Sequence, residues 1–159
     1  MPERFSPAGV LMSMNTILYE RQLEGYYCTL TYAYFDVKRR TLTMANSGLP
    51  YALHSTGDRC APIELPGVPL GTFPGTVYDQ VAVELSQGDV FVFCTDGIYE
   101  TFDAAGEELG TARVADMVQR HRLEPAAAIA DAVFGETEAF RGDGPQGDDM
   151  TVVVVKITA

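Results

Sequence analysis

The stretch GDVFVFCTDGIYE, residues 88–100, holds the longest unbroken apolar, strand-like run of the chain. Its five apolar residues, Val90–Cys94, predict a β-strand that is buried on both faces. Asp96 follows almost at once, and a carboxylate at the end of a buried strand needs a partner, because an unpaired buried charge is costly. A divalent cation is one such partner. Gly97 would allow the backbone to turn sharply or to approach a ligand closely.

A second acidic pair occupies the mirrored position near the C-terminus. Asp148 and Asp149 lie between a glycine-rich loop, residues 142–147, and a β-branched strand predicted over 150–157. If the two strands are neighbours, these carboxylates and Asp96 could converge on one magnesium or manganese ion, since both prefer oxygen ligands. The alternative is that Asp-Gly forms an ordinary turn and that the later aspartates cap a loop. Spacing alone leaves both interpretations open.

The remaining pattern predicts an α+β fold with mainly antiparallel sheets. Ser6-Pro7 is typical of a helix start, and helical spacing of apolar residues continues toward a predicted end near residues 23–25. Alternation then predicts hairpins over 26–46 and 51–65, and helical spacing returns in two segments over 114–140. The order is a helix, about six strands, two helices and a final strand. Helices should pack outside the sheets.

Length and charge limit the possible functions. A chain of 159 residues, 47% of them hydrophobic, fits one domain over 1–159. The formal net charge of −11 argues against nucleic acid and anionic membrane partners. No apolar run approaches the roughly 18 residues of a membrane-spanning helix. Cys28, Cys60 and Cys94 are interpreted as buried thiols in a reducing cytoplasm. The chain has only two histidines, His54 and His121, so it offers few of the side chains that usually bind zinc.

Five segments, in this order, carry a resemblance to a known family: TLTYAYFD (29–36), LTMANSGLPYAL (42–53), GVPLG (67–71), LSQGDVFVFCTDGIYET (85–101) and GDDMTVVVVKI (147–157). The chain resembles the C-terminal part of the stage II sporulation protein E-type phosphatase domain, within the metal-dependent protein phosphatase superfamily. The resemblance implies an αββα sandwich of two packed antiparallel sheets flanked by helices. It also implies hydrolysis of phosphoserine or phosphothreonine by water that two Mn²⁺ or Mg²⁺ ions activate.

The resemblance also implies roles for individual residues. Asp96 matches the aspartate of the family's TDG motif, and Asp148 the first aspartate of DD-x-T; both would be ligands of the same ion. Four residues would support the metal site without being its main ligands: Gly97, Asp149, Asn46 and Gly48. No catalytic residue is identified.

The sequence departs from the family pattern at its start. The N-terminal aspartate and the Asp-x-x-Gly-His-Gly-like segment, which supply the ion-bridging carboxylate, are not found, and Leu49 replaces the usual histidine. We therefore expect an N-terminally truncated domain with about half of the metal site.

Two functions remain open for such a chain. One is a serine/threonine phosphatase whose missing part is encoded upstream, acting on an anti-anti-sigma-type regulator in bacterial signalling. The other is a catalytically inactive module for protein interaction or self-association. Exposed strand edges also predict a homo-oligomer.

Overall fold

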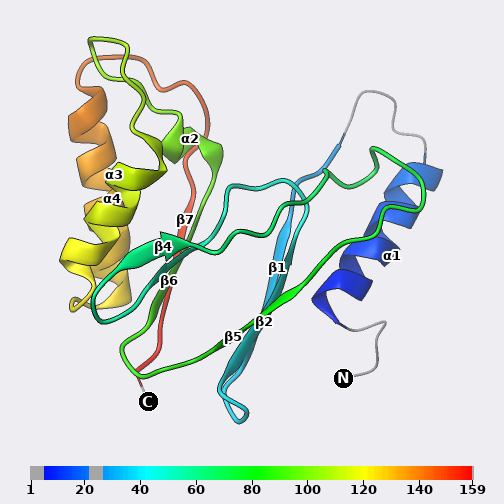
Figure 1. The fold of residues 1–159 in the computed structure, drawn as a ribbon. Coiled ribbons are helices and arrows are strands. Elements are labelled where there is room, and N and C mark those ends of the chain that lie inside the picture. The colour runs from blue at the N-terminus through cyan, green and yellow to red at the C-terminus, as the bar shows by residue number, and fades with distance from the viewer. Residues whose placement is uncertain (1–5, 22–26, 159) are drawn as a thin grey trace. The chain divides into compact units, whose positions relative to one another are not determined.

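The computed structural model describes residues 6–21 and 27–158, which form two compact units (Figure 1). The first unit, unit 1, comprises residues 1–49 and 65–85, and the second, unit 2, comprises residues 50–64 and 86–159. Each unit holds one antiparallel sheet with its own helices. The predicted α+β fold class, two antiparallel sheets flanked by helices, is thereby confirmed. In the described part of the chain, no helix is long and apolar enough to cross a membrane.

Unit 1 is a three-stranded sheet covered by one helix. The strands are β1 (Thr31–Asp36), β2 (Thr41–Asn46) and β5 (Val81–Glu84), in the order β1-β2-β5. Helix α1 (Pro7–Glu20) contacts β1 and β2. Its first turn is capped as predicted, since the Ser6 hydroxyl accepts a 3.1 Å hydrogen bond from the Gly9 amide. The predicted hairpin over 26–46 is confirmed by the β1–β2 pairing.

Helix α1 departs from the prediction in two ways. It ends at Glu20, capped by Arg21, rather than near residues 23–25; residues 22–26 lie outside the described part of the chain. Its apolar periodicity is also a poor guide to burial. Ile17 is 56% exposed, whereas the polar Asn15 is 1% exposed. The reason is that the Asn15 amide satisfies the backbone of a distant loop, with bonds of 2.9 Å to the Phe73 carbonyl and from the Gly71 amide.

Unit 2 is a four-stranded sheet with three helices. The strands are β3 (Leu53–Ser55), β4 (Cys60–Pro62), β6 (Val90–Cys94) and β7 (Val152–Lys156), in the order β4-β3-β6-β7. Helices α3 (Gly110–His121) and α4 (Ala126–Arg141) pack on one face of this sheet: α3 contacts β3 and β4, and α4 contacts β7 (Figure 1). The third helix, α2 (Asp96–Tyr99), follows β6 directly.

The core of unit 2 confirms the interpretation of the apolar run. Val90, Phe91 and Val92 are each 0% exposed, so successive residues on both faces of β6 are buried.

The hairpin predicted over 51–65 is confirmed as β3–β4. The single-turn helix α2 was not predicted, but the described residues form six strands before the helices and one after them, as expected. The interpretation of Cys28 as a buried thiol is wrong: Cys28 is exposed, because it precedes β1 and forms only an isolated bridge with Leu70. Cys94 is buried as expected.

Candidate metal centre

The TDG and DDMT segments meet because β6 and β7 are antiparallel neighbours. Cys94, the last residue of β6, is paired with Val152, the first residue of β7. Beyond that pair the Thr95 side chain joins the two segments. Its hydroxyl donates to the Asp149 carbonyl oxygen at 3.0 Å and accepts from the Thr151 amide at 2.9 Å. The sequence motifs, 54 residues apart, are therefore held together by specific hydrogen bonds within unit 2.

Gly97 fits this contact because it has no side chain. A Cβ atom built on Gly97 would lie 2.5 Å from the carbonyl oxygen of Asp149 and 3.2 Å from that of Asp148. Both neighbours are backbone atoms, which cannot move away as a flexible side chain could. From the sequence, Gly97 was expected to allow the backbone to approach a ligand closely. In the structure it approaches the backbone of Asp148 and Asp149 instead.

Asp96 and Asp148 lie at the two sides of this contact, and both are exposed. Asp96 begins α2, and its Oδ1 accepts a 3.1 Å bond from the Gly97 amide. Oδ1 of Asp148 accepts a 2.7 Å bond from the Asp149 amide. The expectation of a buried carboxylate at Asp96 is wrong: β6 ends at Cys94 as predicted, and Asp96 is exposed two residues beyond it, at the start of α2. Within the described ranges, the second carboxylate oxygen of each residue takes no hydrogen bond.

The two carboxylates fit part of a divalent metal site. They are hard oxygen donors from adjoining segments, the ligand type that magnesium and manganese prefer. Over residues 6–21 and 27–158, however, no group of three or more histidine, cysteine, aspartate or glutamate side chains is placed to hold an ion. Among the described residues, Asp96 and Asp148 therefore remain two candidate ligands without a third beside them.

Asn46 and Gly48 lie in unit 1, where their contacts are structural. Asn46 is 3% exposed, and its Nδ2 donates to the carbonyl oxygens of Leu49 at 2.8 Å and Leu65 at 3.0 Å. Gly48 has φ of +97° and lies against Pro69. Gly67, the first residue of the GVPLG segment, packs directly on the Asn46 backbone. These contacts pack the ANSG segment (45–48) against the PGVP segment (66–69).

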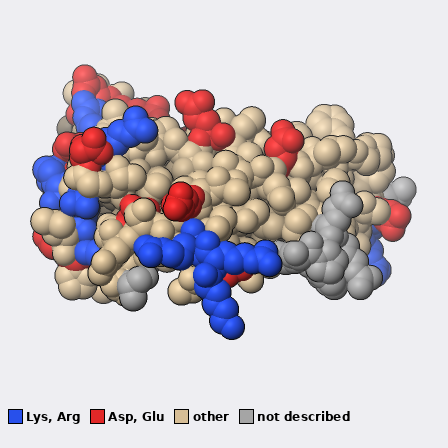
Figure 2. All heavy atoms as spheres, turned by 60° about the horizontal axis from the view of Figure 1, so that its bottom comes forward, with Lys and Arg blue, Asp and Glu red and all other residues tan. Residues whose placement is uncertain are grey.

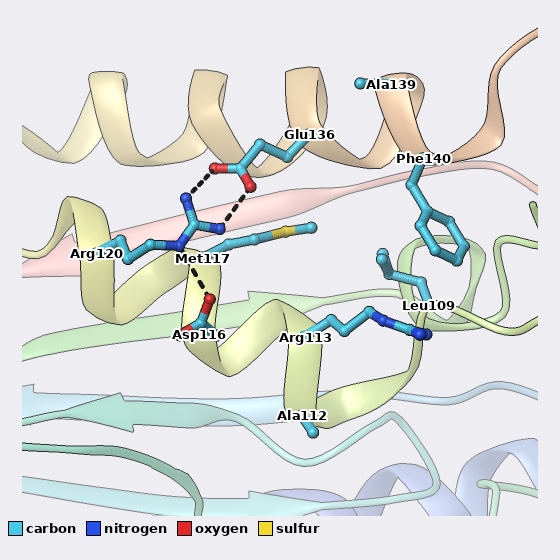
Figure 3. A pocket seen from close by; sticks show the side chains of 9 residues that line it. All are labelled: Leu109, Ala112, Arg113, Asp116, Met117, Arg120, Glu136, Ala139 and Phe140. Atoms are coloured by element: carbon cyan, nitrogen blue, oxygen red, sulfur yellow. Dashed lines mark hydrogen bonds and ion pairs between the residues drawn. The ribbon is translucent and has the colours of Figure 1, made fainter.

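A separate cavity of about 650 Å³ lies between α3 and α4 (Figure 3). Leu109, Met117 and Phe140 give it an apolar lining, and Arg113 lies with its guanidinium carbon 5.2 Å from the centre of the Phe140 ring. Arg120 closes one side: it makes two bonds to Glu136, at 3.0 and 2.6 Å, and one to Asp116 at 2.9 Å. Neither Asp96 nor Asp148 lines this cavity. No motif in the sequence pointed to it.

Cys60 is only half-buried, unlike the buried Cys94, and neither thiol is activated as a nucleophile. Burial raises the pKa of the Cys60 thiol to about 11 and that of Cys94 to about 12. Both thiols are therefore neutral near pH 7, whereas cysteine-based catalysis requires the thiolate. The raised pKa values argue against these two residues as the reactive group of a cysteine-dependent phosphatase.

Acidic charge is concentrated in unit 2. The sequence of unit 1 has six acidic and five basic residues, whereas that of unit 2 has sixteen acidic and six basic residues. Figure 2 shows basic side chains close to acidic ones at the left, the side on which Figure 1 draws α3 and α4. The charges of Arg113 and Arg120 are paired there with Glu107, Asp116 and Glu136.

Comparisons with known proteins place this arrangement in a family. Stage II sporulation protein E of Bacillus subtilis (strain 168) is 26% identical over 148 residues, which are 92% of this chain and 17% of that protein. A solved structure of its PP2C phosphatase domain with a fragment of the regulatory domain has a TM-score of 0.81 and 25% identity, and covers 94% of this chain and 44% of its own.

The fold is also that of the SiaA-PP2C domain of Pseudomonas aeruginosa. The TM-score is 0.83 at 24% identity, over 96% of this chain and 60% of that one. The chain thus spans less than two thirds of each of these relatives. The family model described as "Stage II sporulation protein E (SpoIIE)" matches residues 1–158. The resemblance found in the sequence is confirmed, and the chain belongs to the SpoIIE family of PP2C-type phosphatase domains.

Proposed function

We propose that this chain is the C-terminal part of a metal-dependent serine/threonine protein phosphatase, in which Asp96 and Asp148 bind the same Mn²⁺ or Mg²⁺ ion. The observation that carries the proposal is the hydrogen-bonded contact between the two motifs at Thr95. It brings the backbones that carry both carboxylates to adjoining positions. Upstream residues would supply the bridging carboxylate that the described residues lack.

The chain's own residues have positioning roles in this proposal. Asp96 is fixed at the start of α2 by the bond from the Gly97 amide, and Asp148 by the bond from the Asp149 amide. In each carboxylate this leaves one oxygen for a cation. A divalent ion in such a site supplies Lewis acidity and neutralises negative charge during phosphoryl hydrolysis. Asp149, whose carbonyl oxygen accepts from Thr95, would hold the loop rather than coordinate the ion.

The proposed substrate is a cytoplasmic phosphoprotein, carrying phosphoserine or phosphothreonine, of the anti-anti-sigma type. This part of the proposal rests on the family resemblance alone. The main alternative is a non-catalytic module for protein interaction or self-association. One observation favours it: the described residues gather no third metal-ligating side chain.

Manganese binding to this chain tests the metal assignment directly. Free Mn²⁺ is measured by electron paramagnetic resonance as the ion is titrated into each protein. The proteins are the wild type, Asp96→Asn, Asp148→Asn and a control, Asp143→Asn. Asp143 lies in the same exposed loop as Asp148. We expect each ligand variant to weaken binding about tenfold or more, as is usual for the loss of a charged ligand. The control should remain close to the wild type. Wild-type affinity in Asp96→Asn would refute the assignment.

Hydrolysis separates the two functions. Manganese-dependent turnover of p-nitrophenyl phosphate by this chain, abolished in Asp96→Asn, would support the phosphatase. Manganese binding without turnover would favour the non-catalytic module, and would call for the same assay on a protein that includes the upstream metal motif.

A further inference from the structure

The hairpin between β1 and β2 carries an isolated group of positive charges. Lys38, Arg39 and Arg40 are consecutive, and they are three of the five basic residues of unit 1. The chain as a whole carries a net charge of −11. The tip is therefore a local departure from the charge of the whole chain, and it can attract an acidic partner that the rest of the chain repels.

The tip, Val37–Arg40, is exposed. The side chain of Arg39 is 79% exposed, and Val37 is 74% exposed. Lys38 makes no hydrogen bond or ion pair with any described residue. Two carboxylates lie on the strands near the tip. Asp36 is 3.8 Å from Arg39, and Glu84 belongs to β5, where it is paired with Thr41. Positive charge therefore remains in excess at the tip.

The tip is also held in one conformation. The Arg39 amide donates to Oδ1 of Asp36 at 3.0 Å, and the Thr41 hydroxyl donates to the Arg39 carbonyl at 3.1 Å. The Arg40 carbonyl accepts a 2.8 Å bond from the Leu85 amide, which ties the turn to the end of β5. A contact surface that is already ordered loses less conformational entropy when a partner binds.

Arg40 occupies a backbone conformation that normally favours glycine. Its φ is +53°, and it is the single non-glycine residue with positive φ in the described ranges. Glycine would adopt this conformation without the steric cost that a Cβ atom brings. An arginine at such a position keeps positive charge at the tip at the expense of backbone strain.

We propose that the hairpin tip, Val37–Arg40, is a docking contact for an acidic segment of the phosphoprotein substrate; this rests on the proposed function. A phosphoprotein must approach a chain whose unit 2 carries sixteen acidic residues. The tip offers a local attraction, with Val37 as an apolar contact beside the charges. At physiological ionic strength, charges interact over a Debye length of about 8 Å. A protein segment can place its acidic residues within that distance of the exposed Lys38 and Arg39.

An anionic membrane fits the tip less well. A membrane presents negative charge over a wide area, and the net charge of −11 on the whole chain opposes its approach. A second copy of this chain is the other acidic occupant that the net charge allows. Both remain outcomes of the test.

The test compares two double variants that remove the same charge. Lys38→Gln/Arg39→Gln changes the tip, whereas Arg21→Gln/Arg59→Gln removes two exposed arginines elsewhere. The probe is a fluorescein-labelled peptide with one phosphoserine between runs of aspartate, and fluorescence anisotropy measures its binding to the full chain. At low ionic strength we expect the tip variant to bind about fivefold more weakly than the wild type, the range expected for two exposed charge contacts. The control variant should bind less than about twofold more weakly.

Other results would overturn the docking contact. These are equal binding by the two double variants, tip-dependent binding to phosphatidylserine vesicles but not to the peptide, or tip-dependent self-association by light scattering without peptide binding. The outcome is separable from the proposed function, because the peptide test needs no metal. If manganese binding proves independent of Asp96 while the tip still binds the peptide, the phosphatase assignment fails and the docking contact stands.

Discussion

The Cα atom of Gly97 faces the carbonyl oxygen of Asp149 so closely that a Cβ atom would lie 2.5 Å from it. This contact joins the turn after β6 to the loop before β7. It explains why the residue after Asp96 must be glycine without any appeal to a ligand. It also links the geometry of the two candidate metal-binding carboxylates, since a shift of one segment displaces the other.

Replacing Gly97 by alanine should therefore damage both stability and metal binding. The loop 148–149 must move to admit the methyl group, which we expect to cost about 1–3 kcal/mol of unfolding free energy. Urea denaturation measures the loss, and the manganese titration should show weaker binding. Gly147→Ala is the control in the same loop, because a Cβ there meets no atom within 4 Å. Equal stability of the two variants would contradict the close approach.

Helix α4 offers a prediction of the opposite sign. Gly135 lies inside this helix with open space around the position of a Cβ atom. Gly135→Ala should raise the unfolding free energy by about 1 kcal/mol, because alanine has the higher helix propensity. Gly142, which caps the same helix with φ of +60°, is the matched control. Gly142→Ala should be destabilising by a similar amount. Thermal or urea unfolding of Gly135→Ala and Gly142→Ala measures both effects. If both substitutions raised the unfolding free energy, the proposed difference between the two glycine positions would be refuted.

Asn15 should be essential to unit 1 although it carries no catalytic chemistry. Its side chain is buried and bonds the Gly71 amide and the Phe73 carbonyl, with the Tyr78 hydroxyl at 3.4 Å. Asn15→Ala leaves these groups without that partner, so we expect a loss of about 2–4 kcal/mol. The neighbouring Thr16→Ala, at an exposed position, should change stability by less than about 0.5 kcal/mol. Similar losses in the two variants would argue against the proposed role.

The strained turn at Arg40 gives a test that is independent of charge. Valine is β-branched and tolerates positive φ poorly. Arg40→Val should therefore destabilise the chain by about 1–2 kcal/mol more than Lys38→Val, which removes the same charge from the same turn. Urea denaturation of both variants measures the difference. If Lys38→Val is the more destabilising change, the positive φ at Arg40 is not the controlling factor.

The sequence allowed prediction of elements that have a strong local signal. The run Val90–Cys94 and the Ser6 cap are examples. A strand buried on both faces requires consecutive apolar residues, and an N-cap requires a residue such as serine, so both can be recognised from the residue types. Helix α2 escaped prediction because a single turn is too short to show a helical period. The sequence also did not predict that β5 and β6 belong to different sheets. The short polar segment between them has the composition of an ordinary hairpin turn.

Residues that depend on distant partners were the hardest to interpret. Asn15 looks like a surface residue in the helical pattern, yet its hydrogen-bond partners are more than 50 residues away. The exposure of Asp96 was missed although the end of β6 at Cys94 was predicted, because the single-turn helix that Asp96 begins has no signal in the sequence. The roles of Asp96 and Asp148 as ligands remain predictions.

The contact between α3 and α4 should depend on pH through His121. Its Nδ1 lies 3.0 Å from Glu124 and its Nε2 lies 3.1 Å from Glu136. The hydrogen bond with Glu124, helped by that with Glu136, raises the pKa of His121 above its ordinary value of 6.5. The hydrogen bond from Arg120, followed by that from His121, lowers the pKa of Glu136 below its ordinary value of 4.5.

The signs of these shifts fix the pH range. A raised histidine pKa stabilises the fold fully below pH 6.5, and the effect is lost as pH rises through the folded-state value. The lowered pKa of Glu136 stabilises the fold above pH 4.5, and that effect is lost as pH falls through its folded-state value. The stabilising effect of the His121–Glu136 pair should therefore be greatest between pH 4.5 and 6.5.

Two measurements check this expectation. The difference in melting temperature between the wild type and His121→Gln should shrink as pH rises from about 6 to about 8, where the histidine loses its charge. In an NMR titration, Glu124→Gln should lower the pKa of His121 toward its ordinary value, whereas Glu138→Gln, at an exposed position on α4, should leave it unchanged. A His121 pKa that does not respond to Glu124→Gln would show that the 3.0 Å contact does not hold the proton, and the pH dependence of the α3–α4 contact would then need another source.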